Sequence, residues 1–233
     1  MRQIFLDTET TGLNPAQGHR IIEIAAVEVV NRRLTRNHFH VYLNPDRDID
    51  PGAQEVHGIT LEFLQDKPHF ADTVSDLLDF VAGAELIIHN APFDVGFLNH
   101  ELGMLGMAPI EAGCAGIIDT LKMAKEQRPG QRNNLDALCR FYGIDNSART
   151  LHGALLDAEL LAEVYMAMTR GQESLMMDIA EPVKTAGEVS GTRHHGPLLV
   201  ISANEDELGA HQNYLTALDK AAGGACVWNQ NPA

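Results

Sequence analysis

The chain of 233 residues is short of cysteine, of basic side chains and of long apolar runs. Its three cysteines lie far apart and form no CxxC pair, which argues against a disulfide framework or a zinc ribbon and favours a reducing compartment. No apolar run approaches the roughly 18–20 residues that a membrane-spanning helix needs. The opening sequence MRQIFLDTET is unlike a secretory signal peptide. We therefore expect a cytoplasmic protein without a membrane partner.

Basic side chains are scarce, because 17 lysines and arginines stand against 32 aspartates and glutamates, a net charge of −15. Affinity for phosphates normally comes from a basic surface, so this balance alone argues against a nucleic-acid-binding protein. The stretch 122–149 runs against the trend, with six basic and three acidic residues. It either lines the approach to a site or forms a solvated helical face, and the sequence leaves both interpretations open.

The hydrophobic pattern is that of a folded α/β domain, with 45% hydrophobic and 21% charged residues. Short β-prone segments joined by short connections begin the chain, which indicates an antiparallel meander. The expected strands cover residues 2–7, 21–30, 37–43, 85–89 and 117–118. The expected helices cover residues 70–81, 93–105, 121–127, 135–142 and 152–168. Strands followed by alternating helices and strands predict a mixed sheet with helices on its faces.

The composition changes after Gly171. Residues 180–197 are rich in Pro, Gly, Thr and Ser and have almost no periodicity, which is typical of a linker. A strand, a helix and a short strand are expected between residues 198 and 228. Because 36 residues are too few to bury a stable core alone, we expect the segment 198–233 to fold against a partner.

Asp7 and Glu9 stand two residues apart at the end of the first expected strand, where alternate side chains point to the same side. Two carboxylates so close repel each other unless a cation lies between them, and hard divalent cations prefer such oxygen ligands. The alternative is a pair of solvated acids at a strand end. This motif by itself does not choose between the two.

Two later segments place acids near the start of an expected helix. Asp94 falls in the first turn of one helix, where the helix dipole alone already favours an acid. His152 and Asp157 can meet at one site if His152 lies in a loop before the other helix. Taken singly, each segment also fits a purely structural role, as a capping acid or a surface histidine.

In combination the three segments, D-x-E, H-N-x-x-F-D and H-x-x-x-x-D, resemble the histidine-bearing branch of the DEDD exonuclease superfamily. The resemblance covers residues 2–170 and implies a ribonuclease H-like fold, a mixed sheet of five strands flanked by helices. It implies that two divalent metal ions, Mg²⁺ or Mn²⁺, are bound by Asp7, Glu9, Asp94 and Asp157. His152 would be the general base, and the reaction would release nucleoside 5′-monophosphates from a 3′ end.

The same resemblance implies which side chains contact the terminal nucleotide. They are the catalytic residues Asp7, Glu9, His152 and Asp157, together with Thr10, Thr11, Val56, His57 and Phe93. Val56 and His57 would pack on the base and sugar, and Phe93 would add an apolar wall. Stacking of this kind tolerates any base. For Val56 and Phe93, plain core packing is an equal alternative.

Three stretches are similar to the family of proofreading (epsilon) subunits of bacterial DNA polymerase III: IIEIAAVEVVNRRLT, PGQRNNLDALCRFYGIDNS and RTLHGALLDAELLAEVYMAMT. That family implies DNA 3′ ends as substrate and the polymerase alpha subunit as the partner of residues 198–233, with Trp228 as an anchor. It also implies contact with the sliding clamp through residues 172–177. This hexapeptide ends in Met where an aromatic residue is common, and a frayed helix end is the alternative. A small accessory subunit on the nuclease domain is a further partner that the sequence does not decide.

We therefore expect an exonuclease domain over 1–170, a flexible linker over 171–197 and a polymerase-binding segment over 198–233. A free-standing exonuclease that trims RNA or single-stranded DNA is one alternative, and it would not need the tail. A non-catalytic polymerase scaffold is another, which the five intact catalytic positions disfavour. The net negative charge predicts that this chain alone binds DNA weakly and that the polymerase and clamp supply processivity.

Overall fold

The computed structural model describes residues 1–149, 151–170 and 203–224. The chain separates into two units, 1–181 and 182–233, and each is described by itself. Among the described residues, no helix combines the length and apolar character that crossing a bilayer requires.

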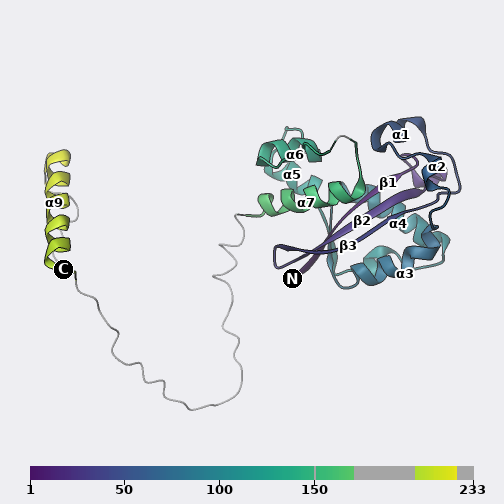
Figure 1. Cartoon of the computed structure of the whole chain (residues 1–233), viewed down its shortest axis with the longest axis horizontal. Helices are drawn as coiled ribbons and strands as arrows, with labels where there is room; N and C mark the ends of the chain where they lie inside the picture. Colours follow the sequence, from purple (N-terminus) through teal and green to yellow (C-terminus); the bar gives the residue numbers. More distant parts are fainter. Residues whose placement is uncertain (150, 171–202, 225–233) are drawn as a thin grey trace, which may run out of the picture. The chain divides into compact units, whose positions relative to one another are not determined.

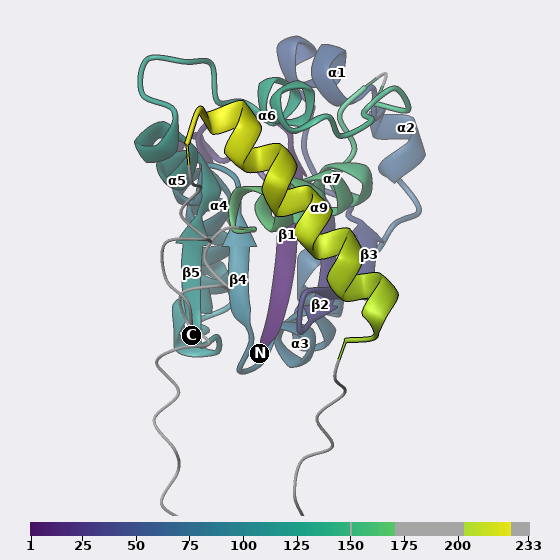
Figure 2. The same ribbon diagram turned by 90° about the vertical axis from the view of Figure 1, so that its left-hand side faces the viewer.

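Five strands form one mixed sheet in the first unit, in the order β3-β2-β1-β4-β5 (Figures 1 and 2). The antiparallel part consists of β1 (Arg2–Thr10), β2 (Ile21–Val30) and β3 (Arg33–Tyr42). The parallel part adds β4 (Glu85–Ile88) and β5 (Gly116–Asp119) beside β1. The predicted mixed sheet of five strands, with the meander first, is confirmed.

Two strands extend beyond their predicted bounds. β1 continues through Thr10, because the polar residues after Asp7 still pair with β2, with a bulge between Glu9 and Thr10. Backbone pairing does not depend on side-chain polarity, so the pattern of apolar residues underestimates this strand. β3 already begins at Arg33, because Asn31 and Arg32 both adopt positive φ, 50° and 61°, and close a tight hairpin.

The main helices lie close to their predicted positions. They are α3 (Phe70–Val81), α4 (Ala91–Met104), α5 (Thr120–Gln127), α6 (Leu135–Tyr142) and α7 (Ala154–Met168). Four short elements were not predicted, because none is long enough to show a helical period: η1 (Pro15–Gln17), α1 (Pro51–His57), α2 (Leu61–Leu64) and η2 (Ile110–Ala112). The prediction that a helix starts at 152 was wrong by two residues, which leaves His152 in the preceding loop.

The alternation of side chains along β1 divides the core between the two faces of the sheet. Ile4 and Leu6 pack with α3 and α4 on one face, and Phe5 packs with α5, α6 and α7 on the other (Figure 1). A large apolar side chain buried in this way contributes about 1.5–3 kcal/mol. The same alternation continues past the core, so Thr8 meets α4 and Glu9 approaches α7.

A buried ion pair joins α4 to the loop that follows β1. Glu101 of α4 accepts two hydrogen bonds from the Arg20 guanidinium, at 2.7 and 2.8 Å, and one from the Ile21 amide at 3.3 Å. Breaking such a pair would leave a buried charge without compensation, which is costly. The pair therefore fixes α4, and with it the helix start that carries Asp94.

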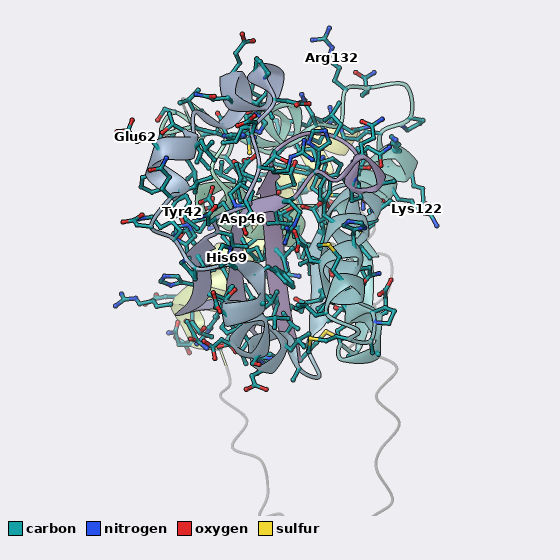
Figure 3. The ribbon with its side chains drawn as sticks, turned by 90° about the vertical axis from the view of Figure 1, so that its right-hand side faces the viewer. Tyr42, Asp46, Glu62, His69, Lys122 and Arg132 are labelled. Carbon is teal, nitrogen blue, oxygen red and sulfur yellow. The ribbon has the colours of Figure 1, made fainter. Side chains whose placement is uncertain are left out.

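The surface carries most of the basic stretch 122–149. Lys122 and Arg132 project outward at the edge of the molecule in Figure 3, and both are exposed. On another part of this surface, His69 Nδ1 lies 3.2 Å from Asp46 Oδ2 (Figure 3). Arg149 differs from the other basic residues, because only 6% of its side chain is exposed.

The described part of the second unit is one helix, α9 (Glu205–Ala222), which confirms the helix predicted there. Asn204 accepts a hydrogen bond from the Glu207 amide, and the Glu207 carboxylate accepts one from the Asn204 amide, a capping box. The predicted linker, the hexapeptide 172–177 and the strands predicted near 198–202 and 226–228 lie outside the described residues. The division into functional segments stays a prediction.

Candidate active site

The five side chains predicted to be catalytic line one cavity of about 270 Å³. They are Asp7, Glu9, Asp94, His152 and Asp157. β1 supplies the first two, the first turn of α4 supplies the third, and the start of α7 with its preceding loop supplies the last two. The fold thus gathers three segments that are far apart in the sequence.

Asp94 is buried beneath the end of β1. Its Oδ1 accepts hydrogen bonds from the Thr8 amide at 3.1 Å and from the Thr8 hydroxyl at 2.7 Å. Burial raises the pKa of Asp94 to about 7, although these hydrogen bonds oppose the rise. Thr8, which the sequence did not single out, therefore orients this carboxyl group.

The two carboxyl groups of β1 also have raised pKa values. Burial raises the pKa of Asp7 well above its usual value, and the neighbouring Asp94 and Glu9 raise it further. Burial also raises the pKa of Glu9 to about 8, helped by the nearby Asp157. Carboxylates crowded in this way lower their free energy by taking up protons or by binding a cation.

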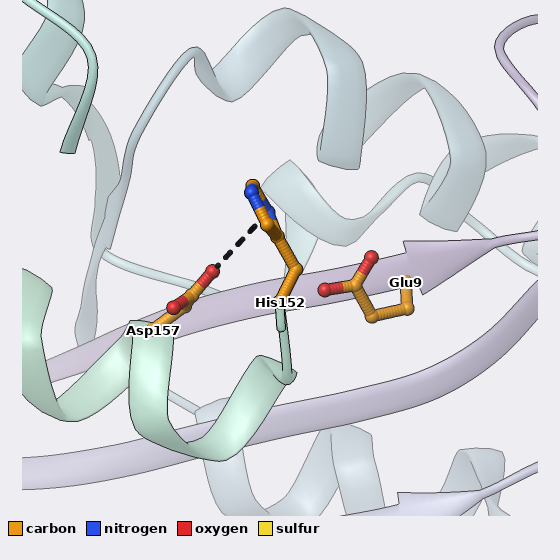
Figure 4. A group of neighbouring side chains, drawn as sticks. All are labelled: Glu9, His152 and Asp157. Carbon is orange, nitrogen blue, oxygen red and sulfur yellow. Dashed lines mark ion pairs between the residues drawn. The ribbon is translucent and has the colours of Figure 1, made fainter. Parts of the chain in front are cut away.

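Glu9, His152 and Asp157 offer ligand atoms that all lie within 4.8 Å of one another (Figure 4). Asp157 is buried, whereas 46% of the His152 side chain is exposed, and 3.6 Å separates His152 Nδ1 from Asp157 Oδ2. Two carboxylates and an imidazole are common ligands for divalent cations. With Asp7 and Asp94 beside them, the donor set fits a divalent metal site.

Helix α1 holds the loop that carries His152. The His152 amide donates a hydrogen bond to the Val56 carbonyl at 3.1 Å. Next to it, Leu151 packs over Gly58, where a Cβ would lie 2.6 Å from the leucine Cδ1. Gly58 also has φ of +72°, a conformation that favours glycine, whereas the exposed leucine side chain could shift to admit a Cβ. A short helix that no sequence pattern predicted thus positions the candidate general base.

Glu23 of β2 fixes the start of α7. It lies opposite Glu9 in the strand register, and its buried carboxylate accepts a hydrogen bond from the Ala154 amide at 3.2 Å. The carboxylate also lies 2.7 Å from His40 Nε2. An acid at a helix N-terminus satisfies free amides and the helix dipole. In the sequence, Glu23 is one acid within an apolar strand, and nothing there signals this role.

Arg149 extends into the same cavity. Its Nε and Nη2 donate to the two oxygens of Asp157 at 2.5 and 2.7 Å, and its Nη1 donates to Asp136 at 2.9 Å. Nη2 also lies 3.0 Å from His152 Nδ1. The hydrogen bonds to Asp157 raise the pKa of the guanidinium above its ordinary value. Of the two interpretations of the basic stretch, Arg149 therefore fits the site, whereas the exposed Lys122 and Arg132 fit a solvated face.

A second pocket of about 560 Å³ adjoins the first and shares Thr8, Glu9 and Phe93 with it. Thr10, Val56 and His57 line this second pocket. Five of the residues predicted to contact a nucleotide therefore line one pocket: Glu9, Thr10, Val56, His57 and Phe93. Their role in binding stays a prediction.

Thr11 follows Thr10 directly but does not line the second pocket. Its side chain is fully buried, its hydroxyl accepts a hydrogen bond from the Arg20 amide at 3.0 Å, and the same oxygen lies 3.1 Å from His19 Nδ1. Thr11 is not among the residues that line either of these two pockets. In this position it holds the loop after β1 in place.

His57 carries an unsatisfied donor. Its Nδ1 accepts a hydrogen bond from the Ile59 amide at 3.0 Å, so the ring proton lies on Nε2. The ring is 6% exposed, and this Nε2 is the one buried side-chain nitrogen or oxygen among the described residues without a hydrogen-bond partner. Burial lowers the pKa of His57, which keeps the ring neutral near pH 7. This donor lies behind the pocket surface, so a ligand oxygen would reach it only after the ring turns toward the pocket.

Comparison with known proteins agrees with this geometry. The sequence profile of the exonuclease family matches residues 4–165. DNA polymerase III subunit epsilon of Salmonella typhimurium is 53% identical, with 97% of each chain covered. The subunit of the same name from Escherichia coli is 51% identical, again with 97% of each chain covered.

Solved structures show the same fold. Exonuclease X in complex with 5′-overhanging duplex DNA is 26% identical with a TM-score of 0.58, covering 73% of this chain and 93% of that one. The nuclease domain of 3′hExo, a DEDDh family member bound to rAMP, is 19% identical with a TM-score of 0.63, covering 73% and 92%. With its cavity lined by carboxyl groups, its family profile and relatives that match nearly its whole length, this chain belongs to the exonuclease family, in the group of DNA polymerase III epsilon subunits.

Proposed function

We propose that this protein is a 3′–5′ DNA exonuclease that removes mispaired 3′-terminal nucleotides for a replicative DNA polymerase. The observation that carries the proposal is the convergence of four carboxyl groups and His152 in one cavity. It occurs in a chain that is 53% identical, over nearly its full length, to an epsilon subunit. A free-standing exonuclease would not account for similarity that extends across 97% of the chain.

The metal ligands in this proposal are Asp7, Glu9, Asp94 and Asp157, and the ions are Mg²⁺ or Mn²⁺. The raised pKa values of Asp7, Glu9 and Asp94 support it, because each of these carboxyl groups would be stabilised by a nearby cation. Bound ions would lower the pKa of a water molecule and offset the negative charge that develops on the phosphate.

His152 is the general base in this proposal. Burial and the adjacent Arg149 lower its pKa, so the ring is neutral near pH 7. A neutral imidazole can accept the proton of the attacking water, and the exposure of the side chain gives water access to it. Asp157 and the Val56 carbonyl hold the ring and its loop at the edge of the cavity.

The second pocket would hold the terminal nucleotide. Val56 is exposed and Phe93 is partly exposed, and together they offer apolar surface on which any base can stack. The free Nε2 donor of His57 would bind an oxygen of the nucleotide. Thr10 lies on the same wall. Stacking without base-specific contacts suits an enzyme that must accept every mispaired nucleotide.

The chain would act as a subunit. Residues 198–233 would bind the polymerase alpha subunit, residues 172–177 would contact the sliding clamp, and the nuclease domain would accept a small accessory subunit. The net charge of −15 supports this arrangement, because such a chain binds DNA weakly by itself and gains from partners that hold the DNA.

Asp7→Asn tests the catalytic assignment. Loss of one metal ligand should lower the rate of Mg²⁺-dependent 3′ hydrolysis of single-stranded DNA at least about a thousandfold. The variant should fold, since the substitution relieves repulsion among the carboxylates. Glu159→Gln, on the exposed side of α7, is the matched control and should retain activity. A folded Asp7→Asn protein with the wild-type rate would refute the assignment.

His57→Phe tests the nucleotide pocket. The variant keeps an aromatic ring but loses the Nε2 donor, so KM for single-stranded DNA should rise about fivefold while kcat changes less. His57→Gln retains a donor and should restore part of the affinity. Steady-state kinetics of the purified proteins provide both values. Equal KM values for wild type and His57→Phe would contradict a contact with the nucleotide.

The raised carboxyl pKa values predict how stability depends on pH. In the folded protein the pKa of Glu9 is about 8 and that of Asp94 about 7, against usual values of 4.5 and 3.8. The folded state therefore binds protons more tightly than the unfolded chain over that range, so stability falls as the pH rises through it. In EDTA, Tm should fall by several degrees between about pH 6 and about pH 8.5. Mn²⁺ should remove most of this loss, and a Tm in EDTA that stays constant or rises would contradict the prediction.

Deletion of residues 198–233 tests the role as a subunit. The truncated protein should keep its 3′ hydrolysis of single-stranded DNA, because the catalytic cavity lies entirely within residues 7–157. It should no longer copurify with the alpha subunit when the two are expressed together. Copurification at the level of the full chain would show that the alpha subunit binds elsewhere.

A further inference from the structure

Arg149 brings positive charge into a cavity lined by acids. Asp7, Glu9, Asp94 and Asp157 line it together with Asp136 near the rim. Arg149 is the one lysine or arginine among the residues that line this cavity, and only 6% of its side chain is exposed. A cation at this depth must compensate part of the carboxylate charge.

The contact between Arg149 and Asp157 uses both carboxylate oxygens. Nε and Nη2 donate in the bidentate geometry typical of strong arginine–carboxylate pairs, at 2.5 and 2.7 Å. Asp157 is also one of the three residues whose ligand atoms converge within 4.8 Å, with Glu9 and His152. A divalent cation bound by Asp157 would share the carboxylate oxygens with the Arg149 guanidinium. The cation and the guanidinium are both positive, and at such short separation they repel each other strongly.

His152 is engaged by the same guanidinium. Arg149 Nη2 lies 3.0 Å from His152 Nδ1 and 3.3 Å from Nε2. One side chain therefore contacts a proposed metal ligand and the proposed general base at once. It fixes their relative positions in this structure.

We propose that Arg149 is a positioning residue that competes with a divalent cation for Asp157. It holds Asp157 and His152 together until a cation binds, and it must release the Asp157 oxygens for that cation to bind. The inference rests on the proposed function, because it takes Asp157 as a metal ligand.

Asp136 can remain bonded to Arg149 when Arg149 releases Asp157. Its Oδ1 accepts from Arg149 Nη1 at 2.9 Å and from Asn146 Nδ2 at 2.9 Å, and 39% of its side chain is exposed. The Arg149 amide donates to the Asn146 carbonyl at 3.0 Å, which anchors the backbone. Release of Asp157 therefore requires only rotation of the flexible Arg149 side chain away from Asp157 and His152, while its contact to Asp136 at the rim can remain.

Calorimetric titration of the full-length protein with Mn²⁺, in the absence of DNA, tests the competition. Arg149→Gln removes the competing cation, so Mn²⁺ should bind to the variant at least about fivefold more tightly than to the wild type. Arg140→Gln removes the same charge from an exposed position on α6 and should leave the affinity unchanged. Arg149→Lys keeps the charge but cannot make the bidentate contact, and it should bind Mn²⁺ with intermediate affinity.

Thermal unfolding gives a second measurement on the same proteins. In EDTA, Arg149→Gln should have a lower Tm than the wild type, since Asp157 loses its partner, and added Mn²⁺ should raise its Tm by a larger amount. If Arg149→Gln does not fold, the Lys variant is measured against Arg140→Gln instead.

The outcomes separate this inference from the function on which it rests. Mn²⁺ binding by the wild type with equal or weaker binding by both Arg149 variants would overturn the competition and leave the proposed function standing. Absence of Mn²⁺ binding by the wild type would overturn the metal site itself, and the inference with it. Tighter binding by Arg149→Gln, intermediate binding by Arg149→Lys and unchanged binding by Arg140→Gln support the competition.

Discussion

Mutual repulsion among the buried carboxyl groups is the constraint on which the rest of the structure depends. Burial and like charge raise the pKa values of Asp7, Glu9 and Asp94 together, so the set is unfavourable unless protons or cations compensate it. Two hydrogen bonds from Thr8 and a bidentate contact from Arg149 supply part of that compensation. The remainder is available to protons or to a divalent cation, and the proposed metal site would use this uncompensated charge.

Elements that take no part in the chemistry hold this arrangement in place. Glu101 and Arg20 fix α4, Glu23 fixes the start of α7, and the Val56 carbonyl fixes the loop of His152. Each of these contacts joins segments from different parts of the sheet and its helices. The cavity therefore depends on the whole domain, because no single element could keep like charges close together.

The acidic character of the chain is compatible with its proposed activity on DNA if a partner holds the DNA. Most of the basic stretch 122–149 is exposed, and the one arginine that enters the cavity pairs with carboxylates. Within the cavity, little positive charge is thus left to bind a phosphate. The proposed enzyme would receive its 3′ ends from a partner, and relatives that match 97% of this chain are named as subunits of a polymerase.

The sequence alone determined the mixed sheet and most of the helices, because apolar periodicity is local. It also predicted the five residues that the fold gathers in one cavity, because three separate motifs had to agree in order. It missed α1 and extended neither β1 nor β3 far enough, since short helices and polar strand ends carry little periodicity. The role of Glu23 was decided by tertiary structure, because its partner Ala154 lies 131 residues away. Arg149 stands only eight residues from Asp157. Whether its side chain points into the cavity or toward solvent still depends on how the loop before α7 packs, and only the tertiary structure determines that packing.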